Sequence, residues 1–370
     1  MQLLPELHTG GAERSALEIG RALVAQGHRS VVISAGGRLV EQLIAEGSEH
    51  HALPIAKKSL RTLLQIRPLR RLLDEIDPDL MHVRSRLPAW LAHFAACKSA
   101  PATVSTVHGL NSVSAYSAIL TRAQRVIAVS QTSANYLIDN YPRLDQLRLR
   151  VIPRGMWSQD FPHQFQPAPS WISEFRQQFP ALNGDKLLTL PGRGTRLKGH
   201  LSALQLLAAV RGRGVDARLL LLGAEQPGRE RYLAELREQG RGLGVDEYWV
   251  ATPSRRDVRE VYAISDLLLQ LSERPESFGR TVAEALHQGR PVLGWDLGGV
   301  GEQLRRSFAP GAVEFGDQCA LTEQACRLLL DPQLEAIDRG SIPTIEAMQE
   351  ATLAVYAEVL EERLRKGPVA

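Results

Sequence analysis

The residues best suited to chemistry lie in the stretch ERPESFGRTVAEALHQG, which contains the glutamates Glu276 and Glu284. Glu276 follows a proline in a segment typical of a loop, whereas Glu284 lies inside an apolar helical pattern. Carboxylates suit ligands rich in hydroxyl groups, because each can accept from two neighbouring hydroxyls. A simpler interpretation stays open, in which Glu276 complements a helix dipole and Glu284 is solvated.

The amino end of this predicted helix presents backbone N–H groups that the helix itself does not satisfy. They belong to Phe278, Gly279, Arg280 and Thr281, and Gly279 keeps a side chain out of the way. Such an end favours an anion by about 0.3–1 kcal/mol at the surface and by up to ~2 kcal/mol when partly buried. The pattern predicts an anion-binding helix start next to Glu276.

A second candidate is GRGTRLKG, where Arg193 and Lys198 lie five residues apart just after a predicted strand. Two cations held by a glycine-rich turn suit a diphosphate. The segment is not a P-loop, because it lacks the GK[ST] ending. Surface cations in a flexible loop remain the alternative.

Three further sites follow predicted strands in the first half of the chain. Gly10 and Gly11 precede a helical pattern, the segment HVRSR contains Arg84 and Ser85, and His108 stands between an apolar strand and a glycine. Parallel sheets bind ligands at the carboxyl ends of their strands, which favours a binding role for these residues. A tight turn at the glycines and a structural role for His108 are the simpler alternatives.

The elements that must position these residues alternate between short apolar strands and helical patterns of 10–15 residues, which is typical of a parallel, helix-covered sheet. Residues 155–185 interrupt the alternation and predict a domain connection with one short helix at Ser170 to Gln178. We therefore predict an α/β protein with two Rossmann-like domains, 1–160 and 180–345, facing each other across a cleft.

The composition restricts the class of protein. A net charge of only +3 argues against a protein that binds nucleic acid through its overall charge. A hydrophobic content of 44% is ample for buried cores. Cys97, Cys319 and Cys326 are scattered, so neither a disulfide framework nor a metal cluster is expected. The sequence has no signal-peptide pattern and no apolar run of membrane-span length, which predicts a cytoplasmic protein.

One basic run qualifies this expectation. The segment from Lys57 to Arg71 carries six cations and no acid, with leucines at near-helical spacing, although Pro68 argues against one long helix. It is either the solvated face of a packed helix or an interfacial segment that binds an anionic membrane surface.

Several ordered motifs resemble one known family. TGGAER, VHG and VIAVSQTS in the first half are followed by VIPRGMWSQDF at the domain junction and then by GRGTRLKG, ESFGRTVAE and GGVGE. The chain resembles the retaining glycosyltransferases of family 4, which have the GT-B fold. The set spans most of the chain, and "TVHGLNSVSAYSAIL" is similar to the enzymes of lipopolysaccharide-core and surface-polysaccharide biosynthesis.

For the C-terminal domain, the resemblance implies a nucleotide-sugar site. Arg193 and Lys198 would neutralise the donor diphosphate, Glu276 would hold hydroxyls of the donor sugar, and Glu284 would accept from the ribose. The backbone from Phe278 to Thr281 would contact the donor.

For the N-terminal domain, the resemblance implies an acceptor site. Gly10 and Gly11 would let the backbone meet the diphosphate, His108 would sit beside the transferred sugar, and Arg84 and Ser85 would line the acceptor side. A terminal helix, residues 346–370, would pack back onto this domain.

The resemblance further implies retaining hexosyl transfer to a glycan or lipid-linked acceptor without metal, cofactor or protein base, with UDP as the expected nucleotide. Two departures bear on this: Arg154 stands where asparagine is frequent, and Ala251 stands where glycine is frequent near the base. A sugar-nucleotide epimerase and a non-catalytic nucleotide-sugar binder are the alternative functions.

Overall fold

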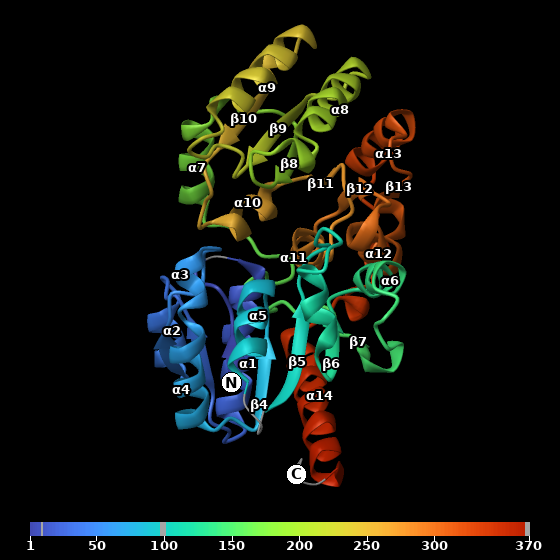
Figure 1. Ribbon diagram of the computed structural model, residues 1–370. Helices are drawn as coiled ribbons and strands as arrows, with labels where there is room; N and C mark the ends of the chain where they lie inside the picture. The colour runs from blue at the N-terminus through green and yellow to red at the C-terminus, as the bar shows by residue number, and fades with distance from the viewer. Residues whose placement is uncertain (9, 97–100, 367–370) are drawn as a thin grey trace. The chain divides into compact units, whose positions relative to one another are not determined.

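The structure is a computed structural model that describes residues 1–8, 10–96 and 101–366, so Cys97 lies outside the described residues. The chain divides into two compact units (Figure 1). Unit 1 comprises Met1–Gly155 with Ile345–Ala370, and unit 2 comprises Met156–Thr344. Residues 156–160, which the sequence assigned to the first domain, therefore belong to unit 2.

Unit 1 is built on a seven-stranded parallel sheet with the strand order β3-β2-β1-β4-β5-β6-β7. Its strands are β1 (Gln2–Leu3), β2 (Val31–Ser34), β3 (Glu49–Ala52), β4 (Leu80–Val83), β5 (Ala102–Val107), β6 (Arg125–Ala128) and β7 (Leu149–Val151). Its helices are α1 (Gly11–Ala25), α2 (Val40–Ala45), α3 (Leu60–Leu63), α4 (Ile66–Ile76), α5 (Arg86–Ala95), α6 (Gln131–Asn140) and α14 (Ile345–Lys366).

Successive residues in and directly after the strands β1 and β2 enter two different hydrophobic clusters. Leu3 and Ile33 lie in one cluster, whereas Leu4 and Val32 lie in the other. Successive side chains of a strand point to opposite faces, so both faces of this sheet are buried. Such burial explains why the strands read as continuous apolar runs rather than as alternating patterns.

The terminal helix α14 packs on unit 1, against α1 and β5 (Figure 1). Its Tyr356 hydroxyl lies 2.6 Å from Nδ1 of His82, whose Nε2 lies 2.7 Å from Thr106 Oγ1. Further along the helix, Glu358 pairs with Arg125 of β6 and with Arg150 of the edge strand β7. The last helix of the chain is thus part of the first unit.

Unit 2 contains a six-stranded parallel sheet with the order β10-β9-β8-β11-β12-β13. Its strands are β8 (Lys186–Pro191), β9 (Ala217–Leu222), β10 (Trp249–Thr252), β11 (Leu267–Gln270), β12 (Val292–Trp295) and β13 (Ala312–Val313). Its helices are α7 (Pro169–Gln178), α8 (His200–Gly212), α9 (Glu230–Gly242), α10 (Val258–Ile264), α11 (Arg280–His287), α12 (Gly298–Ser307) and α13 (Gln318–Leu330).

Both sheets have a point where the strand order reverses. The chain lays down β8, β9 and β10 in one direction and then returns to place β11 on the other side of β8, and unit 1 does the same with β1 and β4. The loops at the carboxyl ends of the two strands beside such a reversal diverge and leave a crevice where ligands bind. In unit 2 these are the loops that contain Lys198 and Glu276.

Two local predictions are confirmed. The predicted helix at Ser170 to Gln178 is α7, Pro169–Gln178, which begins with a proline at its first position. The basic run forms two helices, α3 and α4, separated at Leu64 and Gln65. Pro68 lies in the first turn of α4, where its missing N–H would have no helical partner.

Among the residues that the structure describes, no helix combines the length and the apolar character that a membrane crossing requires.

We expect the free energy of unfolding to fall as the pH drops from 7 to 5. Burial, together with the charges of Arg84 and the N-terminus, holds the pKa of His82 well below its usual value. The unfolded chain takes up a proton near pH 6.5 that the folded chain excludes, so stability falls below that pH by up to about 1.4 kcal/mol per pH unit.

Urea denaturation followed by circular dichroism at the two pH values measures this loss. His82→Gln should shrink the difference, while His28→Gln, at an exposed position of the same unit, should leave it unchanged. A wild-type protein that is equally stable at pH 7 and pH 5 contradicts the prediction.

Candidate active site

A charge pair joins the two loops at the strand reversal of unit 2. Lys198 Nζ lies 2.7 Å from Glu276 Oε1, and their side chains are 23% and 26% exposed. The hydroxyl of Ser272 donates to the same carboxylate oxygen. Two residues that lie 78 positions apart in the sequence therefore form one accessible charged site.

Glycines bring these two loops together. Gly199 ends the Lys198 loop in the left-handed region, at φ 73°, and a Cβ there would lie 1.9 Å from the carbonyl oxygen of Leu271. On the other side, the amide of Gly299 donates to the carbonyl of Glu276 at 2.7 Å, and a Cβ on Gly299 would lie 2.7 Å from the Cα of Phe278. The close approach of backbone to backbone therefore requires glycine at both positions.

The start of α11 is held in place behind Glu276. Gly279 precedes the helix at φ 81°, and the Gln303 amide donates to the carbonyls of Phe278 and, at 2.9 Å, of Gly279. Thr281 accepts from Gln270 Nε2 at 2.6 Å, which ties the first turn to the end of β11. The helix begins at Arg280, as predicted, so its first amides lie where the sequence placed them.

Glu284 is buried, with only 9% of its surface exposed, so the interpretation of a solvated Glu284 is wrong. Its side chain leans back one turn, and Oε1 accepts from Arg280 Nε at 2.9 Å. Burial, and then the Glu284 charge, raises the pKa of Tyr262 well above its usual value. The buried Glu284 carboxylate needs a partner such as Arg280, because burial of an unpaired charge would cost several kcal/mol.

Arg193, in the same loop as Lys198, is exposed. In the described part of the chain no carboxylate forms an ion pair with its guanidinium, in contrast to Lys198.

Ion pairs that are partly open to water contribute only about 0–1 kcal/mol to stability. The Lys198–Glu276 contact can therefore be exchanged for ligand contacts at little cost to the fold.

Unit 1 has its own pocket, of about 210 Å³, at the reversal between β1 and β4. It is lined by Arg84 and Ser85 after β4, by His108 after β5, and by Glu13 at the start of α1. Arg84 is only 4% exposed, and its Nε donates to Gln2 Oε1 at 2.7 Å. The three residues predicted to line an acceptor site thus surround one pocket.

Two side chains occupy the space over the N-terminal glycines. A Cβ on Gly10 would lie 1.9 Å from Glu13 Oε2, and a Cβ on Gly11 would lie 1.9 Å from Arg154 Nη1. Arg154 Nη2 also lies 2.7 Å from Nδ1 of the half-buried His108. Burial, and then the charges of Arg154 and Arg84, lowers the pKa of His108 well below its usual value. That Gly10 and Gly11 contact a diphosphate stays a prediction.

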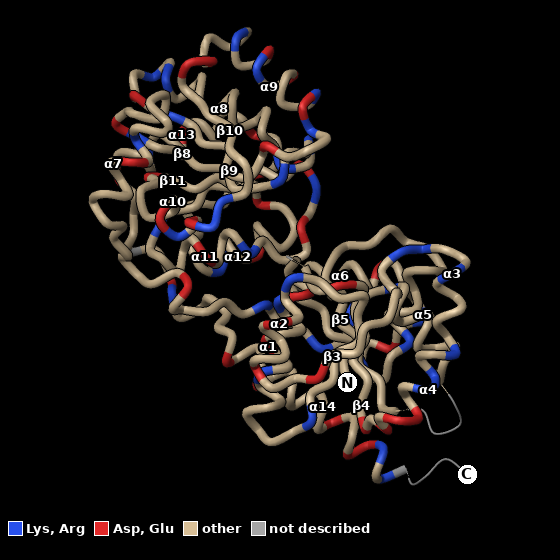
Figure 2. The backbone as a smooth tube through the Cα atoms, turned by 90° about the vertical axis from the view of Figure 1, so that its left-hand side faces the viewer, with Lys and Arg blue, Asp and Glu red and all other residues tan. Residues whose placement is uncertain are grey.

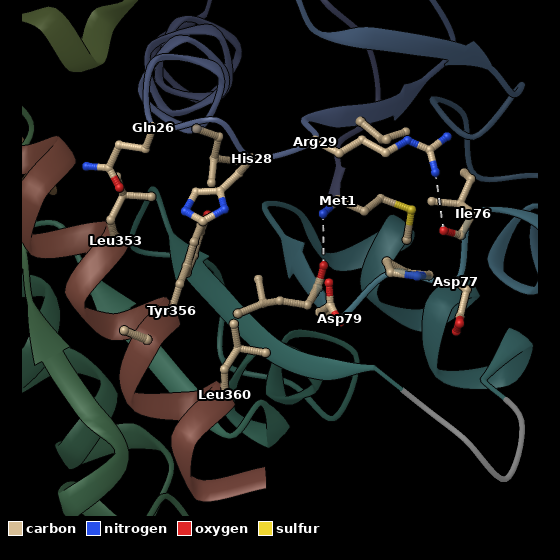
Figure 3. Close-up of a pocket in the computed structure, with 15 residues that line it drawn as sticks. Met1, Gln26, His28, Arg29, Ile76, Asp77, Asp79, Leu353, Tyr356 and Leu360 are labelled. Carbon is tan, nitrogen blue, oxygen red and sulfur yellow. Dashed lines mark hydrogen bonds between the residues drawn. The ribbon is translucent and has the colours of Figure 1, made fainter. Parts of the chain in front are cut away.

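A larger pocket of unit 1, of about 320 Å³, lies at the opposite edge of the sheet, where β1, β2 and β4 begin (Figure 3). Met1, Arg29 and Asp79 line one side of it, and Leu353, Tyr356 and Leu360 of α14 line the other. None of the predicted site residues lies there, and doubly wound sheets bind ligands at the other edge.

No group of three or more metal-binding side chains occurs among the described residues.

Comparisons with known proteins identify the family. The model for Glycosyltransferase Family 4 matches residues 9–156, and the model for Glycosyl transferases group 1 matches residues 172–339. Together they span well over half of the 370 residues. The chain belongs to the family 4 glycosyltransferases.

Relatives of this glycosyltransferase include the N-acetyl-alpha-D-glucosaminyl L-malate synthase of Bacillus anthracis, which is 28% identical over 163 residues, or 44% of this chain and 41% of the relative. The chain spans less than half the length of the curated relatives it matches.

Solved structures resemble this glycosyltransferase over almost its whole length. A glycosyltransferase from Rickettsia africae has a TM-score of 0.84 at 23% identity and covers 98% of this chain and 99% of its own. Anabaena HepE, solved with UDP and glucose, has a TM-score of 0.77 at 21% identity and covers 96% and 98%. At these identities the likeness shows the fold, which is GT-B.

The contacts of three residues around the sites of this glycosyltransferase were not predicted from the sequence. Ser272 donates to the Glu276 carboxylate, and Gln303 donates to the carbonyls of Phe278 and Gly279, but neither position has a sequence pattern that would reveal these bonds. Arg154 did have a signal, because it departs from the usual asparagine of the family motif. An arginine in place of asparagine indicates that a hydrogen-bond acceptor lies nearby, and in the structure this acceptor is Nδ1 of His108.

We expect Gly199→Ala to lower the free energy of unfolding by about 1–3 kcal/mol, because alanine is strained at a positive φ and clashes with Leu271. Thermal or urea denaturation measures the change. Gly212→Ala, at the other end of α8, is the matched control: no atom lies within 4 Å of its added Cβ, and it should stabilise by up to ~1 kcal/mol. Equal stability of the two variants would show that the close approach of the loops is not required.

Proposed function

We propose that this glycosyltransferase moves a hexosyl group, with retention of configuration, from a nucleoside-diphosphate sugar to a glycan or lipid-linked acceptor. The observation that carries the proposal is the contact between Lys198 and Glu276 at the strand reversal of unit 2. It sets a cation for phosphate and a carboxylate for sugar hydroxyls side by side. The structure of the similar HepE with UDP and glucose supports a nucleotide-sugar donor, with UDP as the nucleotide.

The donor occupies this site with its charges matched. The exposed Arg193 and Lys198 neutralise the diphosphate, while the amides at the start of α11 face the same charge. Glu276 accepts from hydroxyls of the sugar. Glu284 accepts from the ribose, because a carboxylate has about four acceptor positions and suits neighbouring hydroxyl groups.

Stabilisation of the leaving group drives the reaction. The acceptor oxygen bonds to the anomeric carbon from the leaving-group face as the bond from that carbon to the diphosphate oxygen breaks. The proton of the acceptor hydroxyl passes to a diphosphate oxygen, and the nucleoside diphosphate departs. Negative charge grows on the diphosphate in this step, so Lys198 and Arg193 stabilise the transition state more than the bound substrate. In this proposal the two cations take the place of a metal ion.

The acceptor binds unit 1 in the pocket that Arg84, Ser85 and His108 line. We propose an acceptor of lipopolysaccharide-core or surface-polysaccharide biosynthesis, on the resemblance of the segment that begins at His108. Glu276 is not assigned as a nucleophile, because its Oε1 already accepts from Lys198 and Ser272, which lowers its reactivity.

One assay separates this function from the alternatives. The protein is incubated with UDP-, GDP- and ADP-sugars, with and without lipopolysaccharide-core acceptors. Nucleotide release that depends on the acceptor supports transfer, whereas sugar interconversion without an acceptor supports an epimerase. Binding without turnover supports a non-catalytic binder.

We expect Glu276→Ala and Lys198→Ala to slow turnover at least ~100-fold, about 3 kcal/mol of barrier, because each removes a contact to the sugar or the diphosphate. Steady-state rates measure the effect. Glu273→Ala is the matched control, because Glu273 is an exposed acid of the same loop. Near-normal rates in both site variants would overturn the site assignment.

We further propose that unit 1 binds an anionic membrane surface through the basic run. Leu60, Leu63 and Leu64 are 84%, 49% and 70% exposed, an unusual position for three neighbouring leucines. The cations among and around these leucines, including Lys57, Lys58, Arg61 and Arg67, are also exposed. Figure 2 shows blue stretches of backbone at α3 and α4. Leucines that project among cations, without an acid between residues 50 and 73, match a surface with anionic headgroups over an apolar interior.

The protein should therefore float with vesicles that contain phosphatidylglycerol at low salt, and not with neutral vesicles. Leu60→Ser with Leu64→Ser should weaken binding at least ~10-fold, because two apolar side chains no longer enter the bilayer. Leu147→Ser, which changes a leucine of unit 1 that is 81% exposed, should have no effect. Failure of the wild-type protein to bind anionic vesicles would remove this proposal.

A further inference from the structure

Arg154 is held on a fixed stretch of backbone. Two residues before it, the amide of Ile152 continues the sheet by donating to Ala128 O at 2.9 Å. One residue after it, the amide of Gly155 donates to the sulfur of Met348 in α14, at 3.3 Å. Pro153 limits the backbone between them. The guanidinium of Arg154 therefore starts from a backbone anchored on both sides.

That guanidinium bridges the start of α1 and the end of β5. Nη1 lies over Gly11, where the absence of a Cβ leaves room for it, and Nη2 lies 2.7 Å from His108 Nδ1. Any larger residue at position 11 would displace the guanidinium. Gly11 thus has a reason to be glycine that is independent of any ligand.

The contact determines which nitrogen of His108 carries the proton. A guanidinium has only donors, so Nδ1 must supply the lone pair, and the proton of the neutral ring is on Nε2. The charged groups that face the ring are Arg154 and Arg84, with His82 nearby, and Glu13 lines the same pocket. The two arginines oppose a second proton on the ring.

We propose that Arg154 is a positioning residue that holds His108 as the neutral Nε2–H tautomer, so that the ring donates a hydrogen bond to a hydroxyl oxygen of the bound sugar. In this state Nε2 of His108 carries a proton and has no lone pair, so it cannot take a proton from the hydroxyl group of the acceptor substrate. The sugar as ligand rests on the proposed function, whereas the tautomer rests on the contact between Arg154 and His108 alone.

Nitrogen-15 NMR of the ligand-free protein tests the tautomer directly. Two-bond proton–nitrogen spectra of histidine-labelled protein distinguish a protonated ring nitrogen from an unprotonated one, and comparison with His108→Gln assigns the signals. We expect His108 to show an unprotonated Nδ1 and no titration between pH 8 and pH 5.5. A protonated Nδ1, or a titration in that range, would overturn the proposal whether or not the protein transfers sugar.

Variants test the part played by Arg154. Arg154→Met removes the donor and the charge, and we expect the Nδ1–H form of His108 to appear or its titration to move towards pH 6.5. Arg154→Lys, which keeps the charge and a donor, should retain the Nε2–H form. Arg148→Met, at an exposed arginine of the same unit, should change nothing. An unchanged His108 spectrum in Arg154→Met would contradict the assignment.

A kinetic cycle separates positioning from direct contact with substrate. If Arg154 acts through His108, Arg154→Met should lower kcat about tenfold in the wild-type background and by less than twofold in the His108→Gln background. Equal losses in both backgrounds would show that Arg154 acts independently of His108. Absence of transfer by the wild-type protein would instead count against the proposed function and leave the NMR result standing.

Discussion

The contact between Lys198 Nζ and Glu276 Oε1 joins the loops that follow β8 and β11, and it forms the centre of the proposed donor site. The strand order places these loops next to each other, because the chain reverses direction between the two strands. Gly199 allows the Lys198 loop to reach Leu271, and Gly299 holds the carbonyl of Glu276. The charges meet only because the backbones can approach this closely.

The pair is better suited to binding than to stability. Both side chains are about a quarter exposed, and pairs of this kind stabilise a fold by about 1 kcal/mol at most. Glu284, by contrast, is buried and paired with Arg280 of the same helix, so its carboxylate is held in place by the fold. We therefore propose that the exchangeable pair meets the sugar and the diphosphate, and that the fixed carboxylate of Glu284 meets the ribose.

Local patterns made part of this arrangement predictable. The apolar spacing around Glu284 correctly gave the helix and its start, and the separation of Glu276 and Glu284 onto a loop and a helix is confirmed. The distance between Lys198 and Glu276 was not predictable, because 78 positions separate them and the contact depends on how two loops pack. For the same reason the contact between Arg154 and His108 was missed, although Arg154 was recognised as a departure from the family motif. The burial of Glu284 was left open because periodicity alone does not show how deeply a helix packs.

The affinity of the wild-type protein and of Lys198→Ala for a nucleoside diphosphate and its monophosphate, measured by titration calorimetry, tests the central claim most directly. UDP and UMP are the first pair to use, followed by the guanosine and adenosine pairs. We predict that the wild-type protein prefers the diphosphate by at least ~10-fold, because the proposed site places Lys198 against the additional phosphate, and that Lys198→Ala loses this preference. A variant that keeps the full preference for the diphosphate would contradict the account.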